Sequence, residues 1–277
     1  MSSSSSFSRR NLFKASALAA AAGVIAVGAP QAQAQNRILG TVIDYAAGVP
    51  TAASVKAAGH IGAVRYVSGR RPGADWMAGK PVTAAETQDF AAAGLAVASV
   101  YQFGKAATAD WKAGAAGAAA HAPQAIAYHR AAGGPTGRPI YIAIDDAPTR
   151  AQYDRQIRPY LQAFSAALNL AGYQTGVYGN YSTIEWAIAD GIGEYFWQHK
   201  WGSNGKIHPR AALYQVRIDD DADSIGGLGV DVNYVYAQDW GQWTPGQTGT
   251  RSLPTSDSLD LQQLTDLVNQ AIRNLSS

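Results

Sequence analysis

Eight short β-rich runs, separated by helical or irregular stretches, occupy the sequence between residues 38 and 236. Each run consists mainly of Val, Ile, Leu, Tyr and Ala, which is the composition of a strand buried on both faces. The runs are Ile38–Asp44, Ala63–Val67, Leu95–Tyr101, Ile140–Asp145, Thr175–Tyr178, Tyr195–Trp201, Ala212–Val216 and Gly229–Tyr234. This alternation predicts an α/β fold.

Helical patterns lie between these runs, at Ala52–Ala58, Ala84–Ala93, Ala109–Ala132, Arg150–Ala171 and Ser182–Ala189. Thr83 and Glu86 have the spacing of a capping box, and Gly94 and Gly172 stand where helices should end. Eight strands over about 200 residues predict a (β/α)8 TIM-type barrel. Its last third should be irregular, because the final connections are short and poorly helical. A doubly wound sheet is the alternative, but no Gly-rich phosphate loop follows the first run.

The N-terminus has the features of a twin-arginine signal peptide over residues 1–34. Arg9 and Arg10 precede an Ala-rich apolar run, and an Ala-x-Ala-like cleavage site ends at Ala34. An ordinary secretory signal with two chance arginines is the alternative. The run is too short and too rich in Ala and Gly for a membrane span. We therefore expect export by the twin-arginine machinery, an extracellular or cell-wall location, and a mature chain without a transmembrane anchor.

The sequence predicts three segments after the signal: a barrel domain over residues 36–241, a Pro- and Gly-rich linker over 242–258, and an amphipathic helix over 259–277. The apolar stripe of that helix has to be buried. The stripe could be buried against the barrel or against a partner protein, and the sequence does not distinguish these two alternatives.

Charge and cysteine content exclude several classes of function. Loss of Arg9, Arg10 and Lys14 with the signal turns the net charge of +2 into −1. No basic surface that would track nucleic acid is therefore expected. The absence of cysteine excludes a disulfide scaffold, a thiol nucleophile and a thiolate metal site. We predict neither a cofactor nor a metal ion.

Polar and aromatic side chains stand at the ends of most predicted strands, where the loops of a barrel build the active site. Carboxylates serve as acids, bases or nucleophiles, and flat aromatic rings pack against sugars. The candidate catalytic residues are Asp44, Asp145, Asp146 and Asp231, and the candidate substrate-binding residues are Tyr101, Tyr178, Trp197, Gln215 and Asn233. Together they predict an acidic cleft for glycan.

Each candidate also has a purely structural interpretation. Aspartates at strand ends often cap helices or form turns, and Tyr178 and Trp197 could be core aromatics. His199 has the position of a structural histidine rather than of a base. The acidic segment Asp219–Asp223 resembles a cation-binding loop, but it lacks the Gly and the distal Glu of an EF-hand, which favours a solvated loop.

Several motifs resemble known families in their order along the chain. Gly40–Asp44, Asp145, Tyr178-Gly179, Tyr214-Gln215 and Val230–Tyr234 look like the barrel lysozymes of glycoside hydrolase family 25, which cut the muramic acid linkage of peptidoglycan. Arg65-Tyr66, Ile140–Asp146 and Gly176–Asn180 look closer still to the glycoside-hydrolase-like domain of unknown function 1906, found in exported actinobacterial cell-envelope proteins. The resemblance covers about residues 38–240.

The resemblance implies that Asp44, Asp145 and Asp231 occupy acidic site positions of the lysozymes. It also exposes a departure: where the lysozymes have Asp-x-Glu, with Glu as general acid, this chain has Asp145-Asp146-Ala147. One hypothesis is a glycoside hydrolase that uses Asp145 or Asp146 as acid, with Asp231 or Asp44 as base, nucleophile or charge stabiliser. The other is a non-catalytic barrel that binds cell-envelope polysaccharide and has lost the acid.

Overall fold

The computed structural model describes residues 37–249 and 261–275. The predicted signal peptide (1–34), the later part of the predicted linker (250–258) and residues 259–260 of the predicted C-terminal helix lie outside these ranges. Within the described ranges, no helix combines the length and the apolar character needed to cross a membrane.

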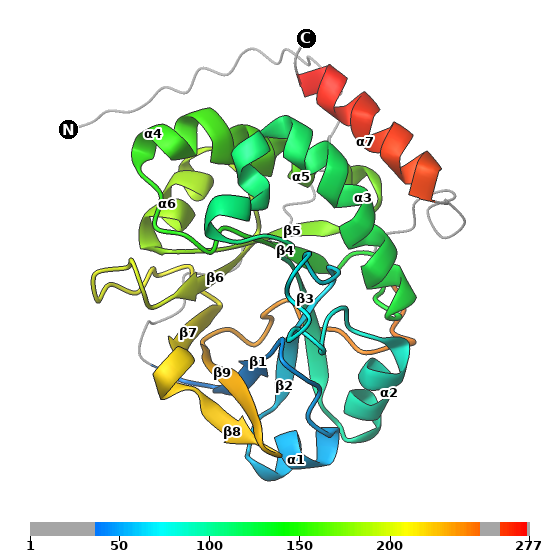
Figure 1. The fold of residues 1–277 in the computed structure, drawn as a ribbon, viewed down its shortest axis with the longest axis vertical. Helices are drawn as coiled ribbons and strands as arrows, with labels where there is room; N and C mark the ends of the chain where they lie inside the picture. The colour runs from blue at the N-terminus through cyan, green and yellow to red at the C-terminus, as the bar shows by residue number, and fades with distance from the viewer. Residues whose placement is uncertain (1–36, 250–260, 276–277) are drawn as a thin grey trace, which may run out of the picture. The chain divides into compact units, whose positions relative to one another are not determined.

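Eight strands close into a barrel, which confirms the predicted TIM-type fold (Figure 1). Seven of them pair in parallel in chain order. The eighth closes the barrel by pairing with the first and the seventh. The barrel strands are β1 Gly40–Asp44, β2 Gly62–Tyr66, β3 Ala96–Tyr101, β4 Pro139–Ala143, β5 Gln174–Gly179, β6 Tyr195–His199, β7 Leu213–Arg217 and β9 Leu228–Val235.

The closing strand β9 runs antiparallel to both of its neighbours, which departs from an all-parallel barrel. It forms a hairpin with the short strand β8 (Asp223–Ile225), and the turn uses Gly226 and Gly227 at φ 61° and 81°. A tight hairpin leaves no crossover helix, so the chain reverses direction. The end of β9 at Val235 therefore lies beside the start of β1, and Asp231, in the middle of β9, pairs with Asp44 at the mouth of the barrel.

The helices form where the sequence predicts them, and caps define their starts. The side chain of Thr83 accepts a hydrogen bond from Glu86 N, and that of Asn180 accepts one from Thr183 N. The helices of the barrel are α1 Ala52–Ala57, α2 Ala84–Ala92, α3 Ala115–Ala131, α4 Arg150–Gln152, α5 Arg158–Leu170 and α6 Tyr181–Ala189, with a π-helical turn at Tyr153–Ile157 between α4 and α5. No helix separates β6 from β7, so the last third is irregular as expected.

Apolar side chains form two layers on the two faces of the barrel strands. The outer layer, with residues such as Ile142, Phe90 and Phe164, packs between sheet and helices. The inner layer, with Val42 and Leu213 among its members, fills the barrel interior. Because side chains alternate along a strand, the residues two positions further along β1 and β7 also point inward. This arrangement brings their polar side chains to the mouth, above an apolar floor.

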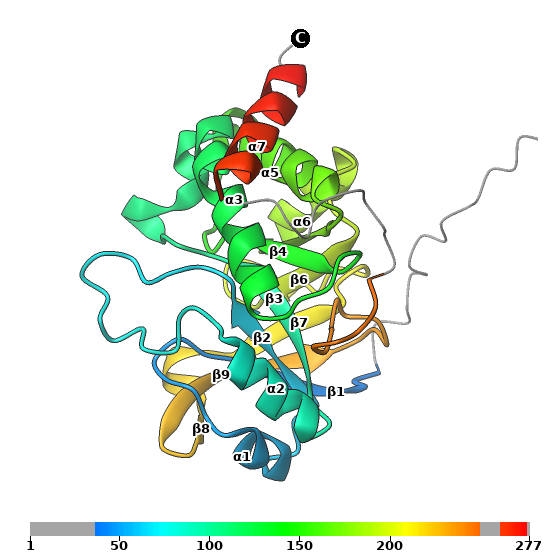
Figure 2. The same cartoon turned by 90° about the vertical axis from the view of Figure 1, so that its right-hand side faces the viewer.

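The chain after the barrel packs back onto it. Trp243, predicted to lie in the linker, is 1% exposed and pairs with Val97 of β3, so the barrel domain continues beyond residue 241. The C-terminal helix α7 (Leu261–Leu275) lies against α3 and α5 (Figures 1 and 2), and Val268 on it is fully buried. This packing corresponds to the docking alternative.

Candidate functional site

A cavity of about 400 Å³ lies at the carboxyl-terminal mouth of the barrel. Asp44 at the end of β1, Asp145 after β4 and Asp231 on β9 all line it. Asp44 and Asp231 face the cavity because they are paired across β1 and β9. Three carboxyl groups from distant parts of the sequence therefore meet at one mouth, as the strand ends predict.

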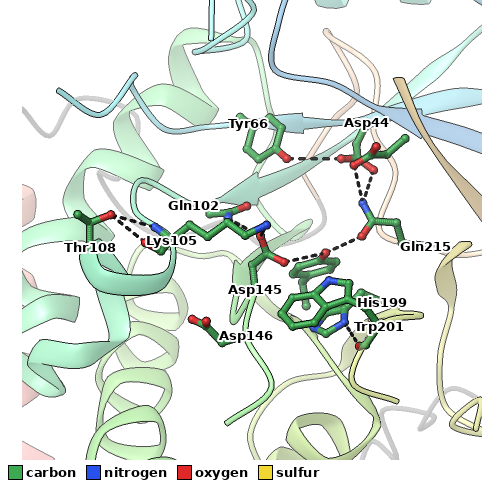
Figure 3. A network of polar contacts seen from close by, with 12 residues as sticks. Asp44, Tyr66, Gln102, Lys105, Thr108, Asp145, Asp146, His199, Trp201 and Gln215 are labelled. Atoms are coloured by element: carbon green, nitrogen blue, oxygen red, sulfur yellow. Dashed lines mark hydrogen bonds and ion pairs between the residues drawn. The ribbon is translucent and has the colours of Figure 1, made fainter. Parts of the chain in front are cut away.

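Gln215 of β7 connects these groups through both ends of its amide (Figure 3). Its Nε2 donates to Asp44 Oδ2 at 3.0 Å and to Asp231 Oδ2 at 3.2 Å. Its Oε1 accepts from the Tyr178 hydroxyl at 2.6 Å. Two donor bonds and one acceptor bond fix the orientation of the amide, so the positions of the two carboxyl groups are coupled through it.

Asp44 is the most enclosed of the three carboxyl groups, at 1% exposure. It accepts hydrogen bonds from Asn233 Nδ2 at 2.8 Å and, more weakly, from the Tyr66 hydroxyl at 3.4 Å. Burial raises its pKa to about 6, against the opposing effect of the hydrogen bonds from Asn233 and Gln215. Asp44 is thus held rigidly in the wall of the cavity.

Asp145 lies two residues beyond the end of β4 and is surrounded by donors (Figure 3). Lys105 Nζ forms an ion pair with its Oδ2 at 2.8 Å, and Gln102 Nε2 donates to the same oxygen at 3.0 Å. The Tyr178 hydroxyl reaches Oδ1 at 3.5 Å. Donors on both of its oxygens thus hold the Asp145 carboxyl group at the cavity.

Asp231, in contrast to Asp145, lies in an environment that disfavours its ionised form. Burial is the main cause that raises its pKa, and the nearby carboxylates of Asp44 and Asp219 add to it, so that the pKa reaches about 8. At neutral pH the protonated acid is therefore the favoured form of this group. A cavity that contains one protonated and one ion-paired carboxyl group has the two components of general acid–base chemistry.

Comparisons with known proteins agree with this geometry. The sequence model of the Rv2525c-like, glycoside hydrolase-like domain family matches residues 53–235. The chain belongs to this family. It is 49% identical over 243 residues to "Putative peptidoglycan hydrolase Rv2525c" of Mycobacterium tuberculosis, a match that covers 86% of this chain and 99% of that protein. The family resemblance predicted from the sequence is confirmed.

Solved structures extend the comparison. The crystal structure of the Tat-secreted protein Rv2525c of M. tuberculosis in complex with L-tartrate has a TM-score of 0.70 and 50% identity, over 74% of this chain and 100% of that one. The catalytic domain of endolysin ply40, from bacteriophage P40 of Listeria monocytogenes, has a TM-score of 0.50 at 11% identity, over 86% and 99% of the two chains. At that identity the second match shows the barrel fold alone.

Asp146, a candidate acid of this Rv2525c-like domain, does not line the cavity. Strand β4 ends at Ala143, so strand alternation no longer determines where Asp146 points. Its Oδ2 accepts a hydrogen bond from Trp111 Nε1 at 3.0 Å, and Figure 3 shows it apart from the network around Gln215. Burial raises its pKa. Ala147, at the position of the lysozyme glutamate, is exposed.

Three predicted substrate-binding residues also lie outside the cavity wall. Tyr101 points to the helix side of the barrel, where its hydroxyl forms a hydrogen bond with His121 Nδ1 at 2.6 Å. Trp197 fills the barrel interior, and its Nε1 donates to Asn233 Oδ1 at 2.7 Å. Asn233 is fully buried beneath Asp44. Trp197 and Asn233 therefore support the acidic group, whereas Tyr178 and Gln215 line the cavity.

His199, which the sequence suggests to be structural, is buried and stacks on Trp201 with ring centroids 4.2 Å apart. The acidic loop forms a 3-10 turn at Asp219–Asp221, and Asp223 pairs with Arg217 at 2.6 Å. Among the described residues, no group of three or more His, Asp or Glu side chains is placed to hold a metal ion.

Sequence reasoning missed most of the remaining wall of the cavity. That wall comes from Tyr66, from residues just after β3, and from the long connection between β2 and α2; its members include Tyr66, Arg71, Trp76, Met77, Lys80, Gln102 and Lys105. Gln102 and Lys105 could have been found because they follow a strand end. Trp76 carries another signal, since a tryptophan in a Gly- and Pro-rich loop often marks a binding surface.

Proposed function

We propose that the protein acts on cell-envelope glycan, peptidoglycan or a related polysaccharide, as a glycoside hydrolase. The observation that carries the proposal is the meeting of Asp44, Asp145 and Asp231 in one cavity, where Lys105 pairs with Asp145 and burial raises the pKa of Asp231. Glycoside hydrolysis needs one carboxyl group of each kind on either side of the scissile bond. The name of the M. tuberculosis relative supports the choice of peptidoglycan as substrate.

In this mechanism Asp231 donates its proton to the leaving glycosidic oxygen. Asp145 acts as the base that activates water or as the nucleophile, and Lys105 and Gln102 hold it in place. Asp44 stays beside the acid and, through Gln215, fixes its position. This assignment reverses the roles first expected from the sequence, because burial and neighbouring charge favour a proton on Asp231.

Aromatic rings support a sugar as the ligand. Trp201 and Trp76 both line the cavity, and Trp76 is 58% exposed. Large aromatic surfaces are usually buried, so an exposed indole at a cavity rim is available to pack against a ligand. Sugar rings present apolar C–H faces that match such a surface. We assign these two tryptophans to glycan binding, next to Tyr178.

A second candidate function is glycan binding without turnover, and the specific observation behind it is Ala147. The family 25 lysozymes, as noted above, have their acid at this position, whereas here it is an exposed methyl group. If Asp231 does not reach the leaving oxygen, the cavity still holds a sugar between its polar and aromatic walls. Binding measured without turnover would favour this alternative.

We also propose that the protein works outside the cytoplasm after export by the twin-arginine route. The M. tuberculosis protein Rv2525c, at 50% identity, is described as Tat-secreted. In this chain Arg9 and Arg10 precede an Ala-rich apolar run, as in a twin-arginine signal. Its substrate would be within reach there, in the cell envelope.

The release of reducing ends from purified peptidoglycan tests the proposal. We expect Asp145→Asn to lower the rate by about 100-fold or more, because an amide is neither a base nor a nucleophile. Asp146→Asn is the matched control: it changes the adjacent carboxyl group, which lies outside the cavity, and should keep most of the activity. No turnover by the wild type, or equal loss in both variants, would contradict the hydrolase.

A further inference from the structure

The cavity has three basic side chains, of which the chemistry above uses only Lys105. Arg71, Lys80 and Lys105 line it together with the aspartates. Lys105 is neutralised by its ion pair with Asp145. Arg71 and Lys80 come from the connection between β2 and α2, which Figure 2 shows as a long loop. Two cations thus face the interior of an acidic cleft.

Arg71 has no counter-charge among the described residues. Arg71 as a whole residue is partly buried, and no ion pair or side-chain hydrogen bond joins it to any other residue within 37–249 or 261–275. A half-buried arginine normally gains such partners, because its five donors lose water on burial. An unpaired guanidinium inside a cavity is therefore available to an anion.

Lys80 adds a second, more deeply buried charge, at 5% exposure. Its Nζ donates to the Gln102 carbonyl oxygen at 3.0 Å and lies 3.7 Å from the centre of the Tyr66 ring. Neither partner is an anion. Burial, followed by the nearby guanidinium groups of Arg65 and Arg71, lowers the pKa of Lys80 to about 7. Near pH 7 the Lys80 amine is therefore protonated in only about half of the molecules, and a bound carboxylate would favour the protonated form.

The loop that carries these groups is held firmly at its base. Gly79 N donates to the Ala46 carbonyl at 2.8 Å, and Gly79 O accepts from the buried guanidinium of Arg65 at 2.7 Å. Val82 N donates to Tyr66 O at 3.0 Å. The backbone beside Lys80 is therefore fixed before a ligand arrives, which lowers the entropy cost of binding.

We propose that Arg71 and Lys80, with the exposed ring of Trp76 on the same loop, form a subsite for a carboxylate carried by a sugar of the glycan. The inference rests on the proposed function and narrows it to acidic glycans. The carboxylate pairs with the two cations while the ring of its sugar packs on Trp76. The carboxylate of Asp44, in the same cavity, repels an anion, so this subsite also sets the direction in which the chain lies.

Two sources of such a carboxylate are a uronic acid and the lactyl ether group of muramic acid. Titration calorimetry of the mature protein with two pairs of probes distinguishes them. One pair is a peptide-free peptidoglycan fragment and its carboxyl-reduced form, and the other is a uronate oligosaccharide and its carboxyl-reduced form. We expect at least one acidic probe to bind about tenfold or more tightly than its reduced partner, as charge-assisted hydrogen bonds allow.

Arg71→Gln should remove most of this preference for the acidic probes. Trp76→Ala should weaken the binding of acidic and reduced probes by similar factors. Arg70→Gln is the matched control, since Arg70 is the exposed neighbour outside the cavity and should keep the full preference. Equal binding of acidic and reduced probes by the wild type, or an unchanged preference in Arg71→Gln, would overturn the carboxylate subsite. Either result would still be consistent with glycan binding in the cavity. No binding of any probe overturns both.

Discussion

Replacing Arg65 with methionine is expected to lower the free energy of unfolding by about 3–5 kcal/mol, the usual cost of removing one partner of a buried ion pair. Arg65 is 1% exposed and pairs with Glu86, which is also buried. Its guanidinium further donates to the carbonyl oxygens of Tyr45 and Gly79, each at 2.7 Å. The substitution leaves the buried Glu86 carboxylate without its counter-charge, although the Tyr45 hydroxyl still donates to it, and removes a donor from two buried carbonyls.

Urea unfolding monitored by circular dichroism measures this loss. The double variant Arg65→Met/Glu86→Gln should recover part of the stability, because it also removes the uncompensated charge. Arg150→Met serves as control: it breaks an exposed pair with Asp154 and should leave the unfolding midpoint nearly unchanged. A single variant as stable as the wild type, or a double variant less stable than the single one, would show that Arg65 does not organise this region.

Asp231→Asn is expected to lower the rate of glycan hydrolysis by about 10²–10⁴-fold, which is the usual contribution of a general acid. Asparagine keeps the shape of the protonated carboxyl group but has no proton to donate to the leaving oxygen. In the wild type the rate should fall as the pH rises through about 8, because Asp231 then loses its proton. A pH–rate profile of both proteins on peptidoglycan measures this. A wild-type rate that stays constant up to pH 10 would rule out Asp231 as the acid.

The same group makes stability depend on pH. The folded protein holds Asp231 at a pKa of about 8, above the ordinary value of 3.8, so folding favours the protonated form. Its contribution to stability is fully present below about pH 4 and is lost as the pH rises through about 8. Since Asp231→Asn cannot ionise, its melting temperature relative to the wild type should increase between pH 5 and pH 9. A constant difference would contradict a raised pKa.

The barrel and the place of its site follow from simple sequence patterns. Strand-like runs alternate with helical segments, and polar residues such as Asp44, Asp145 and Gln215 stand at the strand ends. The direction of the last strand could not be predicted in this way. A period of two has the same appearance in both directions. The sequence therefore predicts Asp231 near the end of a parallel strand, whereas β9 is antiparallel and has Asp231 in its middle, paired with Asp44.

Other parts of the site depend on tertiary structure that no local pattern encodes. Asp145 and Asp146 are adjacent in sequence, yet only the first faces the cavity, because the chain has left β4 and Trp111 binds the second. Tyr101 ends a strand but points outward to His121. Arg71 and Lys80 lie on a long irregular loop, where there is no periodicity from which to infer a direction.

Glycan is expected to bind at the acidic mouth of the barrel. A side chain that fills this mouth should therefore prevent binding. Gly229 lines the cavity, and a Cβ added there would meet no atom within 4 Å. It lies two residues before Asp231 on β9, so a side chain at this position points to the same face. Gly229→Trp should therefore fill the cavity without displacing the carboxyl groups, and Gly229→Ala is the size control.

Co-sedimentation of the mature protein with purified insoluble cell wall is the measurement. We predict that the wild type and Gly229→Ala sediment with the wall, whereas Gly229→Trp stays in solution with an unchanged melting temperature. Retention of Gly229→Trp at the wild-type level would contradict a glycan site in this mouth.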